Sequence, residues 1–173
     1  MSENPLYEEA DQSVKAAKTK ATRAETPLDR LLSVISSKVE IPPVILDVPS
    51  RPGVKLRISP NVSQQQIRAW RKNAGEDSKH GMDSTKFAAY VIGNTTIGIL
   101  FNEEEVEEDG HALNFASPSI LAATDAARPV PDAVRAFFGV DAHVESAALA
   151  ILDASGYGDT VEVEDPTKES STN

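Results

Sequence analysis

The sequence contains few residues whose side chains support catalysis or metal binding. Its only histidines are His80, His111 and His143, and no two of them have the close helical spacing of a metal-ligand pair. The chain has no cysteine, which excludes disulfides, thiolate metal sites and cysteine nucleophiles. We therefore predict that the protein is not an enzyme and that it has no catalytic residue, no cofactor site and no metal site.

One histidine has acidic neighbours. The tripeptide Asp109-Gly110-His111 predicts a tight turn, because Asp and Gly accept the positive φ angles that such turns require. The alternative, a hydrolase in which His111 works with nearby carboxylates, lacks a nucleophile placed by a recognisable motif. The acidic run over residues 103–109 lacks the alternating ligands and central glycine of a calcium loop, so we interpret it as a solvated charge run.

A short basic cluster surrounds the only tryptophan, Trp70, and consists of Arg68, Arg71 and Lys72. It follows a capping-box sequence, which predicts a helix over residues 63–73. We expect Trp70 to pack in the core and the cations, with Lys55 and Arg57, to form a positive patch. Such a patch suits the acidic C-terminal region of the same chain, of another copy or of a partner. The alternative is a small regulatory DNA-binding protein that uses this helix for recognition.

The overall charge opposes DNA binding by bulk electrostatics. The 173 residues carry 17 Lys and Arg against 27 Asp and Glu, a formal net charge of −10, whereas phosphate binding needs a cationic surplus. Residues 44–101 carry 8 basic and 4 acidic side chains, while residues 102–173 carry 3 and 16. This division predicts a salt-sensitive, head-to-tail attraction between copies. With no secretory signal and no apolar run of the ~18 residues that a membrane span needs, we expect a cytoplasmic protein.

The composition predicts a folded domain between two flexible segments. Residues 1–26 and 159–173 are rich in charged and small polar residues, which is typical of a disordered N-terminal arm and an acidic C-terminal tail. Between them we predict a single α+β domain over residues 27–158, small and mainly helical, with one or two β-hairpins.

The first helix is predicted to start at Pro27 with Thr26 as its cap, and its apolar stripe consists of Leu28, Leu31, Leu32, Ile35 and Val39. Strands at residues 44–48 and 54–58 predict a first hairpin. A second hairpin is predicted from a strand at 96–101, an acidic turn at 103–110 and a partner strand at 112–115.

A helix is predicted from near Ser84 to just before Gly93, and a short one over Ala133–Phe138 that ends at Gly139. Pro118 and Pro131 each occupy a position where a helix could begin. The last helix is predicted to be capped by Asp141 and to end at Gly156. Its apolar stripe consists of Val144, Ala147, Ala148, Ile151 and Leu152.

Three stretches occur in a characteristic order: DSTKFAAYVI at residues 83–92, AVRAFFG at 133–139, and a helix from Asp141 that ends in ASGYGD at 154–159. Together they resemble the tail assembly chaperones of long-tailed phages that infect actinobacteria, over about residues 48–165. These motifs pack and cap helices and contain no chemical group of their own. The resemblance therefore rests on their combination and order.

The resemblance implies a non-catalytic role in the host bacterial cytoplasm and absence from the mature virion. Such chaperones coat the helical tape-measure protein, keep it soluble and help to bring tail-tube subunits to it. Many exist in a short form and a longer form made by programmed frameshifting, and this chain looks like the short form. The implied partners are the tape-measure protein, the tail-tube protein and the frameshifted longer form of itself.

We also consider a homo-oligomer, and we expect neither a membrane nor a nucleic-acid partner. For each apolar stripe, the alternative to partner binding is that its residues are buried in the hydrophobic core. The candidate partner-binding residues come from these stripes and from the basic cluster: Leu28, Leu31, Leu32, Ile35, Arg68, Arg71, Lys72, Val144, Ile151 and Leu152.

Overall fold

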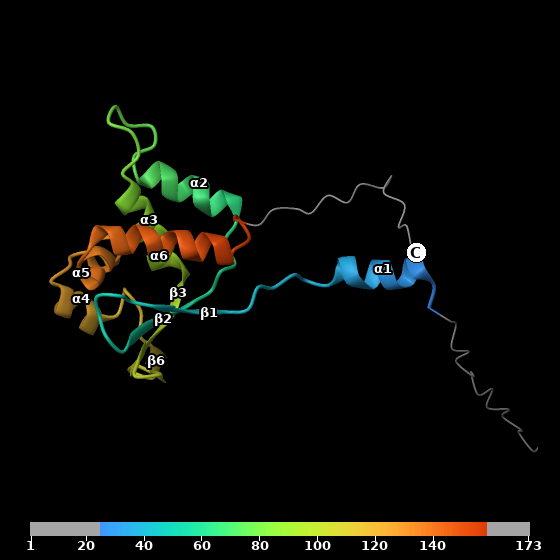
Figure 1. Cartoon of the computed structure of the whole chain (residues 1–173), viewed down its shortest axis with the longest axis horizontal. Coiled ribbons are helices and arrows are strands. Elements are labelled where there is room, and N and C mark those ends of the chain that lie inside the picture. Colours follow the sequence, from blue (N-terminus) through green and yellow to red (C-terminus); the bar gives the residue numbers. More distant parts are fainter. Residues whose placement is uncertain (1–24, 159–173) are drawn as a thin grey trace, which may run out of the picture. The chain divides into compact units, whose positions relative to one another are not determined.

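The computed structural model describes residues 25–158, so the predictions for most of the N-terminal arm and for the tail from residue 159 lie outside the described residues. The chain divides into two compact units, one that ends at Val39 and one that starts at Glu40. The first helix thus belongs to a unit of its own, although the sequence pattern places it in the main domain. Figure 1 shows the elements of both units.

The first unit contains helix α1 (Pro27–Ser36), which confirms the predicted start. The Asp29 backbone N–H donates to the Thr26 hydroxyl at 3.1 Å, and the Thr26 backbone N–H donates to the Asp29 carboxylate at 2.9 Å. This reciprocal capping box satisfies N–H groups at the helix start that have no partner within the helix. The helix ends before Val39, which therefore lies beyond it.

The second unit contains a four-stranded antiparallel sheet of order β1-β2-β3-β4. Its strands are β1 (Val44–Asp47), β2 (Val54–Ile58), β3 (Thr96–Phe101) and β4 (Glu104–Glu105). The pairing of β1 with β2 confirms the first predicted hairpin. Leu56 and Ile58 are fully buried on the core face, while Lys55 and Arg57 alternate with them on the opposite face.

The second predicted hairpin has the wrong partner strands. β3 pairs with β4, and β5 (Glu107–Glu108) pairs with β6 (His111–Ala112) in a separate two-stranded sheet. The chain reverses twice within the acidic run, because Asn102 and Glu103 adopt positive φ angles after β3 and Asp109 and Gly110 adopt them before β6. The acidic run therefore forms edge strands, and the predicted tight turn at Asp109-Gly110 is confirmed.

The remaining helices pack around the core, and α3 lies beside α6 (Figure 1). Buried residues of α3 and α6, including Val91 and Ile151, join Leu56 and Ile99 of the sheet in one apolar cluster. None of the described helices is long and apolar enough to cross a membrane. These helices are α2 (Gln64–Asn73), α3 (Ser84–Thr95), α4 (Pro118–Thr124), α5 (Val134–Phe138) and α6 (Asp141–Ala154), with a kinked segment at Pro129–Ala133 before α5 in which Val130 is extended.

Two helix boundaries differ from the predictions. Helix α3 continues through Gly93, where a Cβ atom would lie 2.2 Å from Cγ2 of Val130, so the glycine allows close packing and does not end the helix. Asp141 is the first residue of α6 and not its cap. Val140 occupies the cap position, and the Asp141 carboxylate instead accepts a hydrogen bond from Arg135 at 2.8 Å.

Candidate functional site

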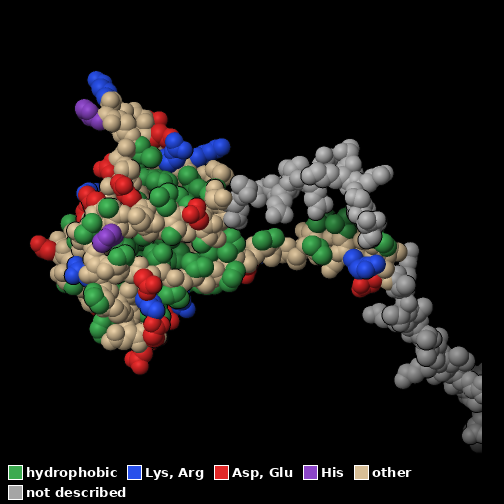
Figure 2. Space-filling model, in the orientation of Figure 1, with side chains coloured by type: hydrophobic (Ala, Val, Ile, Leu, Met, Phe, Trp, Pro, Cys, Tyr) green, Lys and Arg blue, Asp and Glu red, His purple; other side chains and the backbone are tan. Residues whose placement is uncertain are grey.

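The apolar face of α1 is exposed. Its predicted stripe residues have exposed fractions of 60% (Leu28), 55% (Leu31), 49% (Leu32) and 66% (Ile35), and α1 contains no buried residue. Hydrophobic side chains are visible on this helix in the space-filling view (Figure 2). The structure thus brings four candidate partner-binding residues together on one accessible surface, which we call the α1 stripe.

The second predicted stripe is mostly core. Val144 and Ile151 are fully buried, so neither is accessible to a partner, and both are removed from the candidate surface. Leu152 is half-buried and packs against the core cluster. The accessible apolar residue of α6 is Leu149, which is 63% exposed. The prediction missed Leu149 because it lies off the stripe that the helical periodicity selects.

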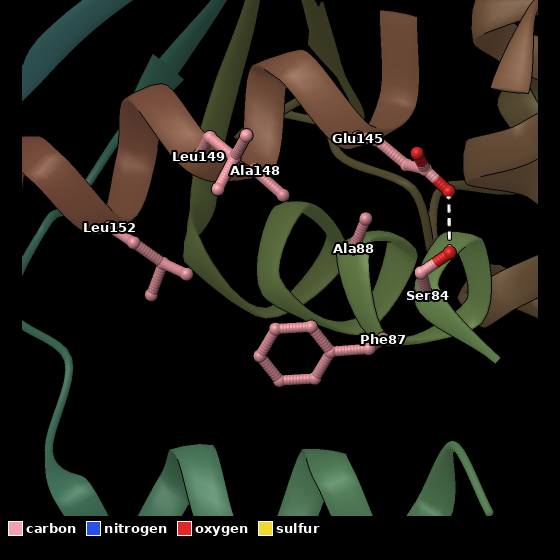
Figure 3. Close-up of a pocket in the computed structure, with 7 residues that line it drawn as sticks. All are labelled: Ser84, Phe87, Ala88, Glu145, Ala148, Leu149 and Leu152. Atoms are coloured by element: carbon pink, nitrogen blue, oxygen red, sulfur yellow. Dashed lines mark hydrogen bonds between the residues drawn. The ribbon is translucent and has the colours of Figure 1, made fainter. Parts of the chain in front are cut away.

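Leu149 borders an apolar groove between α3 and α6 with a cavity volume of about 180 Å³. Figure 3 shows Phe87 and Ala88 of α3 and Ala148, Leu149 and Leu152 of α6 around this space, which we call the α3/α6 groove. The two alanines present little bulk, so another apolar element is able to approach the helices closely. The groove therefore offers apolar contact area on both helices.

One end of the α3/α6 groove carries an ionised carboxylate. The hydroxyls of Ser84 and Thr85 donate hydrogen bonds to Oε1 of Glu145 at 2.7 and 2.8 Å (Figure 3 draws the Ser84 bond). These two bonds lower the pKa of Glu145 below its ordinary value of 4.5, because they stabilise the charged form. The groove thus combines an apolar wall with one fixed negative charge at neutral pH.

The basic cluster is divided by the fold. Trp70 is only 6% exposed, which confirms its predicted place in the core. Arg71 forms an ion pair with Glu76 at 2.6 Å. Arg68 and Lys72 are exposed on the same helix and form no ion pair with another described residue. The DNA-binding alternative would therefore depend on two accessible cations in a chain of net charge −10.

The other cations of the predicted patch pair with the acidic edge strands. Nζ of Lys55 lies 2.5 Å from Oε1 of Glu103, and Nη2 of Arg57 lies 2.5 Å from Oε1 of Glu105. The predicted attraction between the basic patch and the acidic C-terminal region thus occurs within the chain at these two pairs. Figure 2 shows acidic side chains gathered at the end of the domain where β6 lies.

In the part of the chain that the structure describes, no hydrogen bond joins one of the three histidines to another. His111 lines an open cavity of about 330 Å³ with Glu108, Asp109 and Ser117, but no hydrogen bond joins it to a nucleophile among the described residues. Nδ1 of His143 lies 2.7 Å from the hydroxyl of Ser50, which fastens the β1–β2 turn to α6. Within residues 25–158, no group of three or more metal-ligating side chains is positioned to hold an ion.

Comparison with known proteins gives no relative. No family model, no curated protein and no solved structure matches the chain.

Proposed function

We propose that the chain is a non-catalytic assembly chaperone that binds amphipathic helical segments, of the phage tail assembly kind that its sequence resembles. The α1 stripe is the observation that carries this proposal. Four large apolar side chains, each about half or more exposed, lie on one face of a helix that contains no buried residue. Exposed apolar surface of this kind is typical of a site that another apolar surface covers.

The client of this proposal is the tape-measure protein, whose helices present apolar faces of matching periodicity. Helix-on-helix binding uses side chains at spacings of three and four residues, as Leu28, Leu31, Leu32 and Ile35 provide. The net charge of −10 would keep a coated client soluble. In this role the chain acts in the host cytoplasm, recruits tail-tube subunits, works with its frameshifted longer form and is lost before the virion matures.

Co-expression with the tape-measure protein encoded in the same genome tests the proposal. We expect the chain to keep that protein in the soluble fraction and to co-purify with it. Leu31→Gln should abolish co-purification, because it places a polar group in the α1 stripe while keeping good helix propensity. Ser33→Gln changes an exposed residue elsewhere on the same helix and is the matched control. A tape-measure protein that stays insoluble with wild-type chain, or a Leu31→Gln variant that binds normally, contradicts the proposal.

A further inference from the structure

The α1 stripe and the α3/α6 groove are two uncovered apolar surfaces of the same chain. The stripe residues are 49–66% exposed, and Leu149 at the border of the groove is 63% exposed. Each surface presents Leu, Ile or Phe side chains whose burial is favourable. Each copy of the chain therefore has one α1 stripe and one α3/α6 groove, so the stripe of one copy could be buried in the groove of another.

The two surfaces match in length. The stripe runs from Leu28 to Ile35, and the groove follows α6 from Glu145 to Leu152, so each covers seven residue steps of helix. At 1.5 Å per residue, both are about 10 Å long. The small side chains of Ala88 and Ala148 leave room between α3 and α6 for the leucines of another helix (Figure 3).

The charges also complement each other. The carboxylates of Asp83 and Asp141 lie near Glu145, and their negative charges act to raise its pKa. This end of the groove is therefore acidic, although Arg135 forms an ion pair with Asp141. The sequence from residue 15 through the first turn of α1 is net cationic, because Lys15, Lys18, Lys20, Arg23 and Arg30 outnumber the acidic Glu25 and Asp29. An α1 helix whose first turn lies at the Glu145 end of the groove would bring opposite charges together.

We infer that the α1 helix of one copy occupies the α3/α6 groove of a second copy. The contact is heterologous, since a stripe on one copy meets a groove on the next, and reciprocal exchange between two copies closes it into a dimer. The inference goes beyond the proposed function, because it concerns the protein alone and requires no client. Client and second copy use the same stripe, so each excludes the other.

Sedimentation velocity of the full chain, over a range of concentrations and at low salt, tests this inference. We expect a monomer–dimer equilibrium for wild-type protein that NaCl weakens. Leu149→Glu and Leu31→Gln should each raise the dissociation constant at least roughly tenfold, as the loss of one buried leucine contact does. Ala150→Glu and Ser33→Gln change exposed residues of the same helices and should behave as wild type. A wild-type chain that stays monomeric at all concentrations overturns the inference.

Mixing the two variants identifies the contacting surfaces. Leu149→Glu retains an intact α1 stripe and Leu31→Gln retains an intact groove, so an equimolar mixture should form a one-to-one heterodimer although each variant alone is monomeric. If α1 paired with α1, Leu149→Glu alone would still form a dimer through its intact stripe, and the inference would fail. Leu149→Glu should still co-purify with the tape-measure protein, because its α1 stripe is intact. Loss of self-association and loss of client binding are therefore distinguishable.

Discussion

Arg57 on β2 and Glu105 on β4 meet across the intervening strand β3, with Nη2 of the arginine 2.5 Å from Oε1 of the glutamate. Gly98 of β3 lies between them, and a Cβ atom there would be 2.6 Å from Oε1 of Glu105 and 3.2 Å from Nε of Arg57. The absence of a side chain at this position leaves the space in which the two charges meet. The ion pair fastens the acidic edge strand to the centre of the sheet.

The Arg57–Glu105 pair should show a measurable coupling energy that depends on Gly98. A double-mutant cycle with alanine at both positions should give about 0.5–1 kcal/mol by urea denaturation, the upper range for partly exposed pairs. In a Gly98→Ala background the coupling should vanish, because the new methyl group displaces the carboxylate. The same cycle on Arg128 and Asp132, which pair elsewhere, should not change in that background. Retention of the Arg57–Glu105 coupling in Gly98→Ala would refute this account.

Gly93 should respond differently, since its neighbours belong to the packed interior. A Cβ atom there would lie 2.2 Å from Val130 Cγ2 and 3.3 Å from Val134 Cγ2, and these branched side chains have little freedom to move. Gly93→Ala should therefore lower the free energy of unfolding by about 1–3 kcal/mol, the range for overpacking, in spite of the gain in helix propensity. Thermal denaturation beside the exposed control Asn94→Ala measures this. A stabilised Gly93→Ala protein would show that the helix–turn contact is loose.

The fold was predictable from the sequence where short-range hydrogen bonds set the structure. The capping boxes at Thr26 and Ser63 specify helix starts locally, and both the start of α1 and the box at Ser63 are present in the structure. The predictions for Gly93 and Asp141 were wrong because their roles depend on residues of other elements. Gly93 packs against Val130, which is distant in sequence, and Asp141 pairs with Arg135 of the preceding helix. Local pattern carries no information about such tertiary neighbours.

The candidate site was predictable only in part for the same reason. Helical periodicity identifies apolar stripes equally on α1 and α6, but it does not say which stripe the sheet covers. Val144 and Ile151 are fully buried in the core, whereas Leu28 and Ile35 are 60% and 66% exposed. Leu149 borders the groove only because α3 lies beside α6, and no sequence pattern places those helices together.

The pKa of the Glu145 carboxyl should depend on the two hydroxyl groups that donate hydrogen bonds to it. Because its pKa is lowered in the folded chain, chiefly by the Ser84 bond and next by the Thr85 bond, its charged form adds stability above pH 4.5. That contribution is lost as the pH falls through the lowered folded pKa. Ser84→Ala with Thr85→Val should raise the pKa of Glu145 and reduce the loss of stability in acid. An NMR titration of the side-chain carboxyl measures the shift.

Asp29 provides the internal control for that titration. Its pKa is also lowered, by hydrogen bonds from the side chain and backbone of Thr26 in the first unit. The Ser84 and Thr85 substitutions remove no bond to Asp29, so the pKa of Asp29 should stay unchanged in the same spectra. An unchanged pKa of Glu145 in the double variant would mean that the two hydroxyls do not hold the carboxylate in solution.

Thr26→Ala should weaken binding through α1 without touching the α1 stripe. A helix of ten residues is marginal in water, and its cap contributes about 1 kcal/mol, so losing the Thr26 hydroxyl shifts α1 toward unfolded conformations. The stripe is contiguous only while the helix is formed, because its leucines are three and four residues apart. Both self-association and client binding should therefore weaken about fivefold, as expected when ~1 kcal/mol is lost. Thr26→Ser keeps the capping oxygen and should bind as wild type; if Thr26→Ala also binds as wild type, contacts with the partner alone hold the helix together.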